Sequence, residues 1–236
     1  MADTLDLQNS INWATAFVGY APLNNGASNE PAITTANAIM QTILSPPFYW
    51  RWNRTTLTFN TVIGQQDYPV TIANYGYFEL GAVAIAGQQT FPLEYKDILN
   101  AGTEESRPTF IADQLDTSSD SIITFRVLPI PDQVYTITIT YQEQPPSFTA
   151  LSQLWTPIPD RYEFVYNWGF LALMADYIGD PRAARYRQMF VGSLLGVSEG
   201  LSESERALFI QSWLGEIRQE SIYSMKTQMG WKGRTL

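Results

Sequence analysis

The chain has 236 residues, of which 45% are hydrophobic and only 16% are charged, a balance typical of a folded protein and the reverse of that in a disordered chain. The formal net charge of −9 disfavours generic binding to DNA phosphates or anionic membranes, since such binding depends on Lys and Arg. The absence of Cys and His excludes serine–histidine and cysteine–histidine hydrolases, Cys-based zinc sites, zincins and facial-triad iron enzymes.

We expect neither a signal peptide nor a membrane span. The first residues, Met1 to Asp6, contain acids where a signal peptide has bases, and no apolar run approaches the length that crosses a bilayer. The sequence therefore predicts a soluble protein that starts in the cytoplasm and has no membrane partner.

Two helices are predicted in the first part of the chain. The spacing of apolar residues predicts one from Asn9 to Tyr20. Asn29 or Glu30 is expected to cap the second, whose first turn holds a proline, and Ser45 is expected to follow its last turn.

The segment from Phe48 to Arg54 carries four aromatic rings and two arginines. A helical pattern enters this segment and a strand pattern leaves it. We therefore interpret Trp50, Arg51, Trp52 and Arg54 as a structural junction that fixes the β region to the helices. Two alternatives stay open, namely a contact between subunits and a stacking platform for single-stranded nucleic acid or sugar.

Alternating apolar residues and turn residues predict about six short strands between Thr55 and Gln144. The clearest pair is a hairpin in which residues 121–128 pair with residues 133–142 through the link 129–132. Residues 94–101 are expected to form one or two helical turns, which end at Gly102.

Three further helices are predicted in the C-terminal part, and each has a recognisable start signal. The signals are Asp160 with Glu163, Asp180 followed by Pro181, and a capping box of Ser202 with Glu205.

The order of these elements predicts an α+β fold. We expect a helical bundle built from the N- and C-terminal helices, residues 1–54 and 146–224, with an inserted antiparallel β domain, residues 55–145. Residues 225–236 are expected to form an extended C-terminal tail.

Several acidic residues are predicted to lie in loops, where a pair of carboxylates could serve as a catalytic acid and base. We interpret the acids concerned as a solvated loop, and their spacing fails the calcium-loop pattern of alternating acids, turn glycine and closing glutamate. No glycine-rich phosphate loop is present. The sequence thus predicts no catalytic residue, cofactor or metal, and no enzyme. The acids are Glu104, Glu105, Asp113, Asp116 and Asp120.

The last residues carry a charge opposite to that of the rest of the chain, because they include basic residues and no acid. One interpretation is a frayed terminus. The other is a peptide that docks into the groove of a partner, with a tryptophan as its anchor and the basic residues as steering charges. The partner-binding residues predicted on this second interpretation are Met225, Lys226, Met229, Trp231, Lys232 and Arg234.

Three blocks of sequence carry a resemblance to a known family. The first comprises residues 36–54 and 58–61, the second residues 129–135 and 141–142, and the third residues 157–160 and 180–182. Together, over residues 31–230, they resemble the head-to-tail adaptor proteins of tailed bacteriophages, also called connectors or gatekeepers, which include proteins like tail tubular protein A.

This resemblance implies a virion protein assembled in the host cytoplasm into a ring, commonly of twelve copies, at the capsid vertex or neck. The tail residues named above would bind the portal, the helices would pack between copies, and the β part would receive the downstream tail or nozzle protein. Genomic DNA would pass through without specific binding during ejection, and subunits that each carry −9 suit such a conduit.

Two other functions remain open at this point. One is a carbohydrate-binding or glycan-degrading β module of a phage tail that uses Trp50, Trp52 and the acidic loops. The other is a tail-tube or stopper protein, which is also a structural ring-former.

Overall fold

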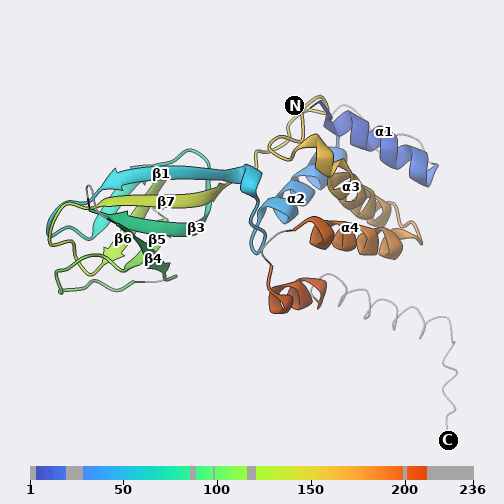
Figure 1. Cartoon of the computed structure of the whole chain (residues 1–236). Coiled ribbons are helices and arrows are strands. Elements are labelled where there is room, and N and C mark those ends of the chain that lie inside the picture. Colours follow the sequence, from blue (N-terminus) through green and yellow to red (C-terminus); the bar gives the residue numbers. More distant parts are fainter. Residues whose placement is uncertain are drawn as a thin grey trace, which may run out of the picture. The chain divides into compact units, whose positions relative to one another are not determined.

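The structure is a computed structural model that describes residues 4–19, 29–85, 89–97, 99–115, 121–198 and 201–211. The chain divides into two compact units. The helical unit comprises Met1–Phe48 with Pro146–Leu236, and the β unit comprises Tyr49–Pro145. Figure 1 shows α1 to α4 packed together in the first unit and the strands side by side in the second.

The helical unit is organised around one central helix, α3, which contacts each of the other labelled α-helices. Helix α3 is apolar around most of its surface, so it can be covered from several sides. Gly169 permits a close approach, because a Cβ atom there would lie 2.9 Å from both Ile39 of α2 and Phe190 of α4. The helices are α1 (Leu7–Val18), α2 (Ala32–Leu44), α3 (Glu163–Tyr177) and α4 (Ala183–Val197), and residues 203–211 are also helical.

One of the three predicted helix starts is made by the expected residues. Ser202 and Glu205 form a reciprocal capping box, in which Ser202 N donates to the Glu205 carboxylate (2.8 Å) and Glu205 N donates to Ser202 Oγ (3.3 Å). The start predicted at Asp180 with Pro181 is wrong, because α4 begins at Ala183 and its N-cap residue, Arg182, makes no side-chain capping bond. The Asp180 carboxylate instead accepts from the backbone N–H of Arg182 (2.8 Å) in the turn before the helix.

The start predicted at Asp160 with Glu163 is also wrong. Asp160 opens a short 3₁₀ turn, η2 (Asp160–Tyr162), so it lies a turn before α3 and cannot reach the first N–H groups of that helix. Its carboxylate instead accepts from the backbone N–H (2.9 Å) and the hydroxyl (2.8 Å) of Thr4. Asp160 therefore anchors the N-terminal segment to the helical unit.

The β unit is one mixed sheet with the strand order β1-β7-β3-β4-β5-β6-β2. Neighbouring strands are antiparallel except for β4 and β5. The strands are β1 (Arg54–Asn60), β2 (Asp67–Thr71), β3 (Tyr75–Ala84), β4 (Thr90–Tyr95), β5 (Phe110–Leu115), β6 (Ile122–Leu128) and β7 (Thr136–Glu143).

The sheet is curled into a half-barrel around its own core. Phe59 and Tyr68 come from the two edge strands, β1 and β2, yet their ring centroids are 5.3 Å apart. This contact between opposite edges of the strand order requires strong curvature. The core contains Val83, Ile111, Phe125, Val127, Ile137 and Ile139, each at most 1% exposed.

The expected fold, a helical bundle with an inserted antiparallel β domain, is wrong, although the α+β class holds. The described strands form a curled mixed half-barrel, because residues 96–109 return the chain so that β5 runs parallel to β4. The helices also depart from a simple bundle: Thr4 contacts Asp160 and Ser10 contacts Asn167, so α1 runs in the same direction as α3.

The predicted hairpin of residues 121–128 with 133–142 is also wrong. Both strands form, but β6 pairs with β5 and β2, whereas β7 pairs with β1 and β3. The link between them contains Pro129 and Pro131, which have no N–H to donate across a closing turn. The predicted helical turn over residues 94–101 is wrong at its start, since β4 extends through Tyr95.

Candidate functional site

The four residues predicted as a junction lie at the start of the β unit. Trp50 is 4% exposed and stacks on Trp52 with ring centroids 5.3 Å apart. The N–H of Trp50 donates to Gln142 of β7 (3.2 Å). Arg51 and Trp52 belong to a 3₁₀ turn, η1 (Arg51–Asn53), and Arg54 begins β1. Their role as a junction between the units stays a prediction.

Arg54 is held by an acidic residue of the neighbouring strands. Its Nε donates to Glu79 of β3 (2.8 Å), which also accepts from Gln142 Nε2 (2.6 Å). The aromatic segment is thus tied to β3 and β7 through one carboxylate.

The six residues predicted to bind the portal, Met225, Lys226, Met229, Trp231, Lys232 and Arg234, lie outside the described residues. Docking by this tail therefore stays a prediction.

The acids considered for catalysis are only partly described. Glu104 and Glu105 are exposed, and Asp116 and Asp120 lie outside the described residues. Asp113 accepts hydrogen bonds from the hydroxyls of Tyr75 and Tyr95. Burial is the main cause that raises the pKa of the Tyr75 hydroxyl, and the nearby Asp113 carboxylate raises it further. The hydroxyl therefore stays protonated and donates. Asp113 thus holds two tyrosines in place.

A cavity of about 230 Å³ lies at the turn between α3 and α4, and Asp176, Asp180 and Arg187 are among its lining residues. Arg182 donates to Asp180 from Nε (3.0 Å) and Nη2 (2.8 Å), and Arg187 donates to Asp176 (2.5 Å). These hydrogen bonds from the Arg182 side chain lower the pKa of the Asp180 carboxyl. The charges around this cavity are therefore engaged with one another.

The described residues contain no group of three or more acidic side chains placed to hold a metal ion. Within the same residues, no helix is both long and apolar enough to cross a membrane.

A different surface has the composition of a binding site: the aromatic face, which we define as Trp13, Phe17, Phe164 and Trp168. The ring of Trp168 in α3 lies edge-on to the rings of Trp13 (5.1 Å) and Phe17 (5.3 Å) in α1. Phe164 precedes Trp168 by one helical turn and so lies on the same side of α3. Phe17 is 45% exposed and Phe164 is 42% exposed.

The aromatic face is a pre-arranged apolar surface that solvent reaches. Aromatic side chains are enriched at protein interfaces because they bury much area with few rotatable bonds. None of these four residues was predicted as a site from the sequence. The signal was present as two aromatic pairs at helical i, i+4 spacing, Trp13 with Phe17 and Phe164 with Trp168.

The model of one protein family, described as SU10 adaptor protein, matches residues 23–208 of the chain. The chain belongs to this family. It is a family of bacteriophage head–tail adaptors, so the resemblance found in the sequence is confirmed at that level. A comparison with curated proteins found no match.

Membership makes the protein a bacteriophage structural protein that is located in the virion and interacts with other head or tail proteins. An adaptor acts through its surfaces, and the aromatic face is a surface of the kind that this role requires.

Proposed function

We propose that the protein is the adaptor that joins the portal to the tail at the neck of the virion, as a ring commonly of twelve copies that forms part of the DNA conduit. The tail residues 225–236 bind the portal, the helical unit contacts neighbouring copies, and the β unit faces the downstream tail or nozzle protein. No catalytic step is assigned to it. The family supports the adaptor role, and the ring and the portal contact are our own extension.

The observation that carries the proposal is the aromatic face. Three aromatic side chains from two helices pack against one another, Phe164 lies one turn before Trp168, and Phe17 and Phe164 keep more than two fifths of their surface exposed. Monomeric proteins rarely leave such a contiguous apolar surface in water, whereas subunit contacts use it. We therefore assign the aromatic face to the contact with a neighbouring copy.

The negative charge of the chain suits a conduit. Each copy carries −9, so a ring repels the DNA phosphates that pass through it and does not retain them.

The test uses portal-containing heads from the same phage that lack this protein. Purified wild-type protein is added, and attachment and ring formation are measured by sedimentation and negative-stain microscopy. Replacing Phe17 and Phe164 by Ser removes the exposed part of the aromatic face and should weaken ring formation at least about tenfold. The matched control is Leu80→Ser, because Leu80 is 53% exposed and belongs to β3 of the other unit.

The tail is tested in the same assay. Deletion of the residues after Gln219 should abolish attachment to heads and leave the melting temperature of the remaining protein unchanged. If wild-type protein does not attach to heads, the adaptor proposal is wrong. If the Phe17→Ser, Phe164→Ser double variant forms normal rings, the assignment of the aromatic face is wrong.

A further inference from the structure

One end of the β unit exposes three aliphatic side chains on two loops. Val62 and Ile63 lie between β1 and β2, and Val134 lies just before β7. Their exposed fractions are 55%, 60% and 58%. We call these three residues the apolar tip.

The two loops of the apolar tip face each other. Thr61 N donates to Tyr135 O (2.8 Å), and Gly64 N donates to Pro131 O (3.0 Å). Val62 and Ile63 lie between the two donors, Thr61 and Gly64. Val134 lies between the two acceptors, Pro131 and Tyr135. The three side chains therefore belong to one patch and are not scattered.

The patch is held rigidly by hydrogen bonds that its own loops make. The Tyr68 hydroxyl accepts from Val62 N (3.1 Å) and donates to Gln65 O (2.7 Å). Opposite, the Tyr135 hydroxyl donates to Asp132 Oδ1 (2.6 Å), and Tyr135 N donates to Thr61 Oγ1 (2.8 Å).

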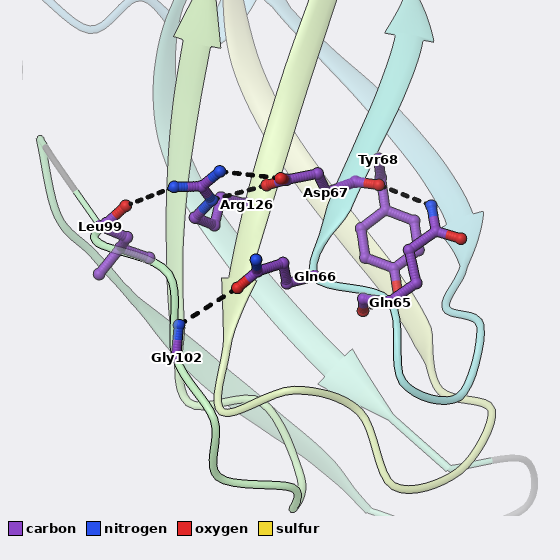
Figure 2. Close-up of polar contacts among 7 residues, drawn as sticks. All are labelled: Gln65, Gln66, Asp67, Tyr68, Leu99, Gly102 and Arg126. Carbon is purple, nitrogen blue, oxygen red and sulfur yellow. Dashed lines mark hydrogen bonds and ion pairs between the residues drawn. The ribbon is translucent and has the colours of Figure 1, made fainter.

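The base of the first loop is fixed as well. Figure 2 shows Arg126 joined to Asp67 and to the carbonyl of Leu99, and Gln66 joined to the N–H of Gly102. The Arg126 Nε to Asp67 distance is 2.6 Å, and the Gly102 N to Gln66 Oε1 distance is 3.2 Å. A surface that is already ordered loses little conformational entropy when it binds, so even a small patch can contribute useful affinity.

The surroundings of the apolar tip are acidic. Asp132 is exposed beside Val134. Glu104 and Glu105 are also exposed, and their segment is bonded to Ile130 through Ile130 N and Glu104 O (2.8 Å). Of the two arginines nearby, Arg126 pairs with Asp67, whereas Arg107 keeps its charge over the Phe91 ring, 3.9 Å from the ring centre, and is outnumbered by the three acids.

We propose that the apolar tip docks into an apolar recess with a basic rim on another protein of the virion. The location of this partner in the virion rests on the proposed function, whereas the chemistry of the partner follows from the exposed aliphatic side chains and their acidic surroundings. An acidic rim opposes an anionic bilayer, so the occupant is a protein and not a lipid surface.

The first experiment uses phage that carry the double substitution Ile63→Ser, Val134→Ser in the full-length protein. Purified particles are analysed by quantitative mass spectrometry and negative-stain microscopy. We expect wild-type amounts of the portal and of this protein, together with an at least about tenfold loss of one virion protein that assembles later. Leu80→Ser is the matched control, and melting curves of the purified variants verify that they fold.

The second experiment measures the affinity of the purified protein for the component lost in the first. Glu104→Lys with Glu105→Lys should weaken this binding several-fold and reduce its dependence on salt, because a basic rim loses its charge partners.

Each remaining outcome would overturn the proposal. These outcomes are complete particles despite the tip substitutions, loss of this protein itself from the particles, self-association that the tip substitutions abolish, and tip-dependent sedimentation with phosphatidylcholine vesicles. Failure of the proposed function is recognised separately, because wild-type protein would then be absent from heads.

Discussion

A buried chain of hydrogen bonds connects α1, the segment before η2 and α3. Trp155 Nε1 donates to Ser10 Oγ (3.0 Å), and Ser10 Oγ donates to Asn167 Oδ1 (2.7 Å). Ser10→Ala should lower the free energy of unfolding by about 1–3 kcal/mol, since it leaves two buried polar atoms without this partner. Urea unfolding followed by tryptophan fluorescence measures the change.

Ser193→Ala serves as the control for this prediction. Ser193 Oγ donates to the carbonyl of Phe190 within its own helix (2.7 Å). Its removal therefore leaves no polar group of another element without a partner. If the two substitutions lowered the free energy of unfolding equally, the hydrogen-bond chain through Ser10 would contribute no more to stability than a hydrogen bond within one helix.

The Asp180 carboxyl gives a prediction about pH. Hydrogen bonds from the Arg182 side chain hold the pKa of Asp180 below its ordinary value near 3.9, so the folded state favours the ionised form. The resulting stability is present above about pH 4 and is lost as the pH falls through the lower, folded-state pKa.

Asp180→Asn should therefore destabilise the protein at pH 7 and pH 5 by similar amounts, and the difference from wild type should shrink below about pH 4. Urea unfolding of both proteins at pH 7, 5 and 3.5 measures this difference. A difference that stays constant over that range would contradict a role for the charge.

Packing between helices depends on one glycine in α3. A methyl group at Gly169 would meet the edge of the Phe190 ring and the end of the Ile39 side chain, both at 2.9 Å. Gly169→Ala should therefore destabilise the protein by about 1–3 kcal/mol from overpacking, partly offset by the better helix propensity of Ala.

Gly192 in α4 provides the matched comparison, because a Cβ atom there would meet nothing within 4 Å. Gly192→Ala should raise the stability by up to about 1 kcal/mol through helix propensity alone. Thermal unfolding of both variants, followed by circular dichroism, measures the two effects. Stabilisation by both substitutions would contradict close packing at α3.

The predictability of the elements differed for a physical reason. Local signals fixed the capping box of Ser202 with Glu205, because its partners lie within one helical turn. Strand pairing is a long-range choice, and alternation along residues 133–142 indicates which side chains are buried but not which neighbour β7 takes. The partners of β6 and β7 were therefore predicted wrongly.

At the scale of the whole molecule, the family was predictable from sequence blocks spread along the chain, and membership is confirmed over residues 23–208. The surfaces were harder to predict. The aromatic face combines Phe17 with Trp168, which meet only after α1 docks on α3, and the apolar tip combines Ile63 with Val134 through bonds between two distant loops. The i, i+4 spacing marks an aromatic pair within each helix, but neither of these long-range contacts has a fixed spacing in the sequence.

The β unit should fold when residues 49–145 are expressed alone. Its core draws only on residues of this unit, and its first and last strands pair with each other from Arg54 with Gln142 to Asn60 with Thr136. The segment is also longer than the roughly 55–65 residues at which many domains fold alone. We expect dispersed amide NMR signals and cooperative urea unfolding.

A control that begins at Thr61 lacks β1 and should lose both properties, because Phe59 no longer covers Tyr68 and Phe125 and β7 loses a neighbour. Random-coil spectra from residues 49–145 would show that the half-barrel depends on the rest of the chain.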